Sequence, residues 1–285
     1  MTNTEFSNSF DTLLNSYSTQ SQFGEQASRR EIVLDEYEKS VLLTQAQDIV
    51  VKSYFDRTLN QQGQGFDDST RRQIDFSSLI KIAELKPLDS GSAGVQTFDD
   101  RGIVYQLPRK VVDGEEVEGT TDVLFILNEK LTQVYTKEGQ STPTLKKDFV
   151  IVPISYREYD REMSKPYAQP LKKQAWRLFQ NQTTGFDINT ELIPRFNVKE
   201  GSSTGGAVTT HFIYKVRYVR RPRPIILEDL DQLEIDGVST ESECELNPIL
   251  HADILNKAVE IAIATRGGAS YQTATAVRNN NQSNG

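Results

Sequence analysis

The fold is organised around one stretch of sequence, His211-Phe212-Ile213-Tyr214-Lys215-Val216-Arg217-Tyr218-Val219. Aromatic and aliphatic side chains alternate there with Lys215 and Arg217, which is the period of a half-buried β-strand. Pro222 and Pro224 end the strand because a proline nitrogen cannot donate to a ladder. From Glu228 to Glu245 the chain then carries eight carboxylates and no Lys or Arg. We interpret this second segment as a solvated acidic connection.

A long helix is predicted directly after the acidic connection. Asn247 is a good N-cap, and Pro248 sits at the first helical position, where its missing N–H costs nothing. Arg266 lies in the last turn, and Gly267-Gly268 provides the stop. Apolar residues fall on nearly all sides of this helix, which indicates that a core or neighbouring subunits surround it.

A second long helix is predicted near the N-terminus, from Asp35 to about Phe55. Asp35 is its cap, and Glu38 follows three residues later, as in a capping box. An apolar stripe begins at Tyr37 and makes this helix the natural packing partner of the C-terminal one. The residues between the two helices are then an insertion.

The insertion contains short β-type runs separated by turn signals. The runs are 103–107, 123–127, 149–154, 175–179 and 191–193, followed by the strand quoted above. Residues 74–85 are predicted as a short helix or an edge segment. Strands and helices do not alternate, so a parallel α/β fold is excluded and an antiparallel sheet or open barrel is favoured.

The sequence therefore predicts an α+β fold in which N- and C-terminal helices form a core around an inserted antiparallel β-rich domain. The predicted parts are an N-terminal arm (1–30), a helical core (31–60 and 224–267), a β-rich insertion (61–223) and a C-terminal tail (268–285). Both terminal segments are polar and are expected to be extended or disordered. Apolar residues of the N-terminal arm keep helical spacing, so a short amphipathic segment that docks on another surface is the other interpretation; they are Phe6, Phe10, Leu13, Leu14 and Tyr17. The few apolar anchors of the two segments, Phe6 and Phe10 in the arm and Tyr271 and Val277 in the tail, are predicted to bind partners.

Composition excludes several classes of protein. A net charge of −8 and a pI near 5.0 argue against a general nucleic-acid binder, which needs surplus Lys and Arg. The single cysteine excludes an intrachain disulfide, and no signal peptide opens the chain. No apolar run approaches the roughly 20 residues of a membrane span. We expect a soluble protein of a reducing compartment.

No motif predicts catalysis, a metal or a cofactor. Cys244 and His251 are seven residues apart, but two ligands are too few for zinc. Gly201-Ser202-Ser203-Thr204-Gly205-Gly206 lacks the Lys-Ser/Thr of a phosphate loop and leads into a strand, which favours a turn. The acidic connection does not follow the EF-hand pattern. A metal-dependent enzyme that uses these carboxylates stays open as an alternative, although we predict no enzyme.

Three arginines, Arg220, Arg221 and Arg223, form a basic corner after the strand. A basic segment near aromatic residues can bind nucleic acid, so a nucleic-acid-binding module that uses this corner is the alternative function. In a chain of this net charge, pairing of the three arginines with carboxylates of the chain or of a partner is favoured.

Four segments taken in order carry a family resemblance: Leu34–Val41, Ser164–Arg177, Val219–Ile225 and Cys244–His251. Together they resemble the neck-ring, or head–tail connector, proteins of crAss-like tailed bacteriophages. The resemblance covers most of the chain, and it implies a helical core with a β-rich insertion and no catalytic residues.

The resemblance also implies partners and location. We expect a virion structural protein whose copies close a homo-oligomeric, dodecameric ring between the portal protein and neighbouring tail or neck ring proteins. Genomic DNA would pass through the channel of this ring without sequence-specific binding, and no membrane is involved. Assembly is expected in the cytoplasm of the bacterial host.

Overall fold

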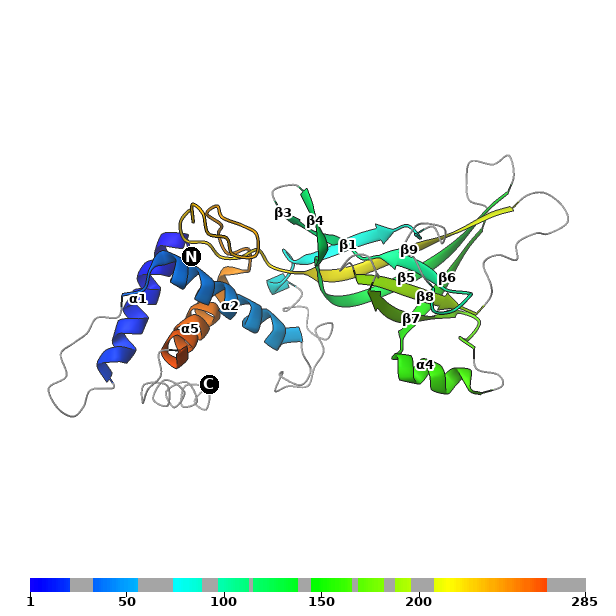
Figure 1. Cartoon of the computed structure of the whole chain (residues 1–285), viewed down its shortest axis with the longest axis horizontal. Helices are drawn as coiled ribbons and strands as arrows, with labels where there is room; N and C mark the ends of the chain where they lie inside the picture. Colours follow the sequence, from blue (N-terminus) through cyan, green and yellow to red (C-terminus); the bar gives the residue numbers. More distant parts are fainter. Residues whose placement is uncertain are drawn as a thin grey trace. The chain divides into compact units, whose positions relative to one another are not determined.

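The computed structural model describes residues 1–20, 33–55, 74–88, 97–112, 115–137, 145–165, 169–181, 188–195 and 208–265. The chain divides into two compact units (Figure 1). The helical unit comprises Met1–Leu79 and Pro222–Gly285, and the sheet unit comprises Ile80–Arg221. The helices at both ends of the chain and the large sheet between them confirm the predicted α+β class.

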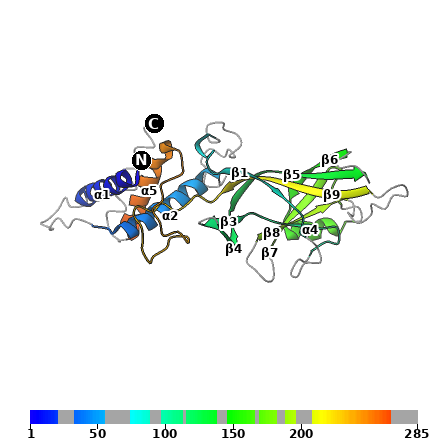
Figure 2. The same ribbon diagram turned by 90° about the horizontal axis from the view of Figure 1, so that it is seen from above.

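The helical unit is built on α1 (Asn3–Gln20), α2 (Glu36–Phe55) and α5 (Pro248–Thr265). α5 packs against both α1 and α2 (Figure 2). Its apolar residues are buried on two sides; they are Leu250, Ile254, Leu255, Ala258, Val259, Ala262 and Ile263. The predicted packing of α2 against α5 is confirmed.

Both predicted helix starts carry the expected cap contacts. The Asp35 carboxylate accepts a hydrogen bond from the Tyr37 N–H at 3.1 Å, and the Asn247 side-chain oxygen accepts one from the Ile249 N–H at 3.2 Å. Each cap satisfies an N–H that has no partner inside its helix. The predicted stop at 266–268 lies outside the described residues.

Residues 3–20 of the predicted N-terminal arm form the helix α1 and are not extended, which agrees with the helical spacing of their apolar residues. Phe6, Phe10 and Leu14 are fully buried. Their spacing of four places them on one helix face, and burying each such side chain contributes roughly 1.5–3 kcal/mol. Three anchors are therefore enough to dock a polar segment on the helices of its own chain. Residues 21–30 lie outside the described part.

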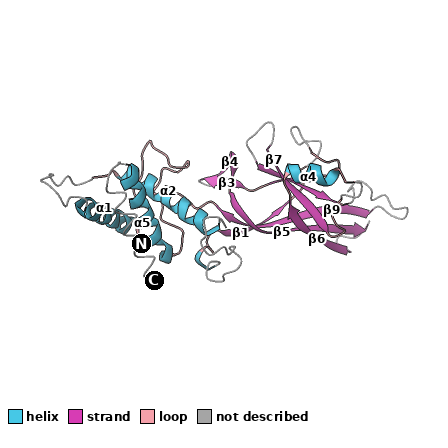
Figure 3. Cartoon of the chain, turned by 90° about the horizontal axis from the view of Figure 1, so that it is seen from below, coloured by secondary structure: helices cyan, strands magenta, loops and turns pink. Residues whose placement is uncertain are grey.

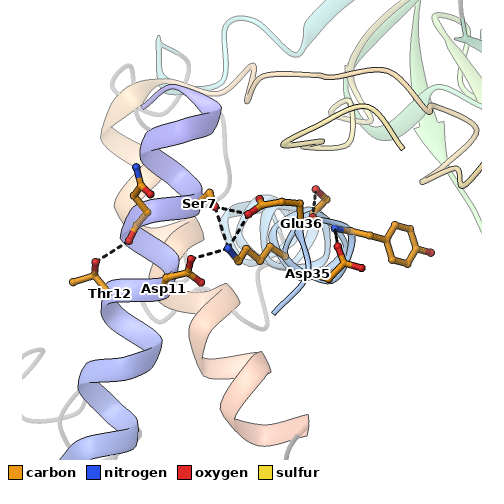
Figure 4. Close-up of polar contacts among 9 residues, drawn as sticks. Ser7, Asp11, Thr12, Asp35 and Glu36 are labelled. Carbon is orange, nitrogen blue, oxygen red and sulfur yellow. Dashed lines mark hydrogen bonds and ion pairs between the residues drawn. The ribbon is translucent and has the colours of Figure 1, made fainter. Parts of the chain in front are cut away.

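A buried lysine connects α1 to α2 (Figure 4). The Lys39 ammonium donates to Asp11 at 2.7 Å, to Glu36 at 2.9 Å and to the Ser7 hydroxyl at 3.1 Å. Burial lowers the pKa of Lys39, but the hydrogen bonds to Asp11 and Glu36 outweigh burial and hold that pKa above its ordinary value. Lys39 is therefore charged throughout the neutral range.

Replacing this lysine should loosen α1. We expect Lys39→Met to destabilise the helical unit by about 1–3 kcal/mol, because it removes hydrogen bonds to charged groups whose acceptors stay partly hydrated. Faster hydrogen exchange of the α1 amides is the measurement. The matched control is Lys52→Met, whose exposed pair with Asp48 at 3.6 Å should contribute only ~0–1 kcal/mol. Equal effects of the two variants would contradict the role of Lys39.

The acidic connection is held onto the helical unit by apolar residues. Ile226, Leu230 and Ile235 are buried and pack against Tyr37 and Val41 of α2. Two isolated bridges, Ile226 with Ser242 and Ile235 with Val238, fix its backbone. Its carboxylates are for the most part exposed, so the predicted solvated acidic face is present on an ordered segment.

The sheet unit contains a seven-stranded sheet (Figure 3). Its strands in sheet order are β1 (Ile80–Leu85), β9 (Val208–Arg220), β5 (Val123–Lys137), β6 (Leu145–Pro153), β7 (Gln174–Asn181), β8 (Ile188–Pro194) and β2 (Ile103–Gln106). β3 (Arg109–Val112) and β4 (Glu115–Thr121) form a separate hairpin. All pairs are antiparallel except β6 with β7, so the expected antiparallel sheet is in fact mixed.

The two edge strands of the large sheet meet at one point. Pro87, just after β1, bridges to Tyr105 of β2, and the Leu88 N–H donates to the Val104 carbonyl at 2.8 Å. The concave side then encloses a core to which β9 contributes Phe212, Tyr214, Val216 and Tyr218. The predicted alternation of core-facing and outward-facing side chains in this strand is confirmed.

One helix of the sheet unit was not predicted. α4 (Tyr156–Met163) lies between β6 and β7, and this crossover makes their parallel pairing possible. The Ser155 hydroxyl accepts from the Glu158 N–H at 3.2 Å, and the Glu158 carboxylate accepts from the Ser155 N–H at 2.9 Å. This capping box is readable in the sequence, but only eight residues follow it.

Candidate functional site

The described residues hold no group of three or more His, Cys, Asp and Glu side chains that could bind a metal ion. Burial raises the pKa of the Cys244 thiol to about 11, and its sulfur lies 3.5 Å from the Gln47 side-chain oxygen. The His251 ring is buried and lies 3.0 Å from the Leu246 carbonyl. Both candidates pack within the helical unit. No helix in the described ranges is long and apolar enough to cross a membrane.

A buried ion pair lies among the strands of the sheet unit. Glu129 of β5 lies 3.2 Å from the Arg177 guanidinium of β7, and it accepts a hydrogen bond from the Tyr214 hydroxyl of β9 at 2.8 Å. Burial raises the pKa of Glu129, while Arg177 and Tyr214 oppose that rise. The Arg177 guanidinium also stacks on the Phe179 ring at 4.4 Å. This arrangement joins three strands of the sheet.

A second polar cluster fixes the segment 97–102. The fully buried Glu191 carboxylate accepts hydrogen bonds from the Phe98 and Asp99 N–H groups at 2.9 and 3.0 Å. Asp99 accepts in turn from Arg101 and from the Tyr159 hydroxyl, each at 2.6 Å. Burial alone would raise the pKa of Asp99, but these donors lower it to about 2. The cluster therefore attaches the segment before β2 to β8 and α4.

The three predicted corner arginines divide between the two units. Arg220 donates to the Arg221 carbonyl at 3.2 Å, and the Arg221 N–H donates to the Asp122 carbonyl at 2.9 Å, both within the sheet unit. Arg223 belongs to the helical unit and pairs with Glu245 at 3.5 Å. An exposed pair of this kind contributes only ~0–1 kcal/mol.

The predicted anchors of the terminal segments have different outcomes. Phe6 and Phe10 are buried within the helical unit, where Phe6 stacks on His251 at 5.2 Å between ring centroids. Their surfaces are therefore used inside the chain. Tyr271 and Val277 lie outside the described residues.

Sequence reasoning missed a groove on the outer face of the large sheet. It has a volume of about 420 Å³ and crosses strands β1, β9, β5 and β6. Ile82 and Val150, two of its lining residues, are 72% and 65% exposed. The polar alternation of the strands signals an outward face, but an apolar residue on that face cannot be recognised without the sheet order.

Comparison with known proteins identifies the family. The family model described as phage tail ring protein 3/4 matches residues 1–274. Ring protein 4/5 of Bacteroides phage crAss001 is 43% identical over 269 residues, covering 93% of this chain and 93% of the relative. Ring protein 3 of the same phage is 32% identical over 271 residues, covering 93% and 96%. The chain therefore belongs to the phage tail ring protein 3/4 family, the structural ring proteins of crAss-like bacteriophages.

Proposed function

We propose that copies of this chain close a dodecameric neck ring that joins the portal to the tail of the virion and lines the channel for genomic DNA. The observation that carries the proposal is the match of the ring-protein family model to residues 1–274. Assembly of the ring takes place in the cytoplasm of the bacterial host under this proposal. The partners are further copies of the chain, the portal protein and neighbouring ring proteins.

The charge of the chain supports passage of DNA without specific binding. The chain carries a formal net charge of −8. An acidic wall repels phosphates, so a duplex can slide past it instead of binding through released counterions. The same charge makes self-association depend on locally complementary surfaces.

The two-unit architecture also suits a ring subunit. Heterologous contacts, in which one surface of a copy meets a different surface of the next, close into a ring when their rotation closes. A chain with a helical unit and a sheet unit offers two chemically different surfaces for such contacts. The Glu129–Arg177 pair joins β5 to β7, and the Asp99 cluster attaches the segment before β2 to β8 and α4.

Electron microscopy of the purified protein, alone and mixed with the portal protein, tests the proposal. We expect closed rings of one size that stack on the portal. Particles that stay monomeric in both samples would contradict it.

The nucleic-acid alternative has a separate test. A module that uses Arg220, Arg221 and Arg223 would bind duplex DNA with an affinity that falls steeply as salt is added. The ion pair of Arg223 with Glu245 favours the structural role. We expect weak DNA binding that is unchanged when all three arginines are replaced by glutamine.

The C-terminal tail is proposed to attach the ring to a neighbouring ring or to the portal. Deleting 268–285 should leave the melting temperature unchanged, because the predicted Gly267-Gly268 stop separates the tail from the last helix. It should weaken complex formation by about tenfold or more, since polar segments with single apolar anchors order on a partner. Size-exclusion chromatography with the portal protein is the measurement.

Point variants test whether the apolar anchors of the tail, and not only its length, are needed for binding. Tyr271→Ala with Val277→Ala should reproduce the loss of binding, whereas Gln272→Ala with Thr273→Ala should not. Unfolding of the truncated chain would place the tail in the core, and undiminished binding would rule out the attachment.

A further inference from the structure

The groove on the outer sheet face combines apolar surface with unused positive charge. Ile82 of β1 and Val150 of β6 supply exposed aliphatic surface, and between them β9 and β5 supply charged side chains. Aliphatic residues exposed to this extent in a surface groove are typical of an interaction site. The groove is thus a candidate for covering by another protein surface.

Two cations of the groove have no acceptor among the described residues. Lys130 is satisfied by Asp148 at 2.8 Å, and Lys215 is paired with Glu84 at 2.8 Å. Arg217 and Lys173 also line the groove and are exposed, and neither is paired within the described ranges. The occupant should therefore bring apolar surface together with at least two carboxylates.

The acidic connection of the same chain presents this combination. Leu233 is 49% exposed at the end of a turn in which its N–H donates to the Leu230 carbonyl at 2.8 Å. Asp231 and Glu234 flank it, are exposed, and pair with no cation of the described part of the chain. The left-handed φ of 49° at Asp231 makes this turn tight, and buried Ile235 anchors it below. Leu233, with Asp231 and Glu234 on either side, therefore forms an exposed apolar knob on an ordered segment.

We propose that the groove of one copy receives the acidic connection of a second copy. Leu233 packs against Val150, while Asp231 and Glu234 pair with Arg217 and Lys173. This contact joins two different surfaces and is therefore heterologous, the type that a closed ring repeats from copy to copy. The inference rests on the proposed ring and names the surfaces that form its subunit contact.

Charge reversal on each side tests the pairing in the full-length chain. The groove variant is Lys173→Glu with Arg217→Glu. The connection variant is Asp231→Asn with Glu234→Lys, because asparagine also tolerates the left-handed backbone at 231. Like charges placed opposite each other weaken an interface strongly, so each variant alone should associate about 100-fold more weakly than the unmodified chain in sedimentation velocity.

Combining the variants distinguishes a contact from damage to the fold. The four substitutions together in one chain should restore association to within about tenfold, because opposite charges again face each other. Mixing the two variants should also restore it, since every groove in the mixture then finds a connection of opposite charge. Matched controls are Lys172→Glu and Asp100→Lys, two exposed residues outside the groove and the knob, and these should associate as the unmodified chain does.

Three other results would each overturn a different part of the proposal. If the unmodified chain forms rings and the variants form them equally well, the groove contact is wrong and the ring stands. If the unmodified chain stays monomeric at every concentration, the ring itself fails. If the groove variant keeps its rings but loses binding to duplex DNA at low salt, the groove belongs to nucleic acid and the pairing is overturned.

Discussion

Ile254→Ala is expected to lower the free energy of unfolding of the helical unit by about 2–5 kcal/mol. Ile254 is fully buried in α5, which packs against both α1 and α2. Truncation removes the transfer free energy of the missing methylene and methyl groups, and it leaves a cavity that two helices would have to collapse to fill. The loss of unfolding free energy should therefore lie near the upper end of the range given above for truncating a buried isoleucine.

The measurement is urea unfolding followed by circular dichroism, which reports mainly on the helices. The matched control on the same helix is Ile249→Ala, because Ile249 is 59% exposed and its change should stay within about 0.5 kcal/mol. The only tryptophan of the chain, Trp176, lies in the sheet unit, so its fluorescence reports that unit separately. Equal unfolding curves for the two alanine variants would show that α5 is not core.

Arg177→Met is expected to destabilise the sheet unit by about 3–5 kcal/mol, because it leaves the Glu129 carboxylate buried without its cation. The two side chains are only 9% and 10% exposed, so water cannot replace the lost partner. Removing both charges should destabilise the sheet unit far less. Arg177→Met with Glu129→Leu is the matched control, and it should recover most of the loss.

This loss should depend on pH. Burial already raises the pKa of Glu129, and loss of Arg177 removes a group that lowers it. A carboxyl whose pKa is higher in the folded state binds its proton more tightly there, so the variant should gain stability as the pH falls from about 8 to about 5. Trp176 fluorescence during urea unfolding measures this pH dependence of the variant's stability. A deficit that is the same at both pH values would contradict an unpaired buried carboxylate.

Local patterns predicted the parts of the fold that are locally determined. The alternation in β9, the caps at Asp35 and Asn247, and the packing of α2 with α5 all follow from spacing and turn chemistry. The alternation and the caps are set by residues within a few positions of one another, and the packing was inferred from the apolar residues that each helix carries at helical spacing.

Features that depend on distant residues were not predicted. The parallel pairing of β6 with β7 depends on the short crossover helix α4, whose eight residues give little periodicity. The docking of α1 depends on Lys39, which reads as an ordinary surface lysine until Asp11 and Glu36 surround it. Glu129 and Arg177 are 48 positions apart in the sequence, and only the order of the strands in the sheet brings them together.

The candidate site was predicted in part. The arginine corner and the acidic connection were recognised from their composition, and the structure pairs Arg223 of the one with Glu245 of the other. The sheet groove was not recognised, because Ile82, Val150 and Arg217 come from three strands whose order the sequence does not reveal.

A reconstruction of the neck of the assembled virion by cryo-electron microscopy tests the central claim most directly. We expect a closed ring of twelve copies between portal and tail, with DNA in its channel and the groove of each copy covered by the acidic connection of the next. Density for this chain outside the neck, or as single copies that do not contact one another, would contradict it.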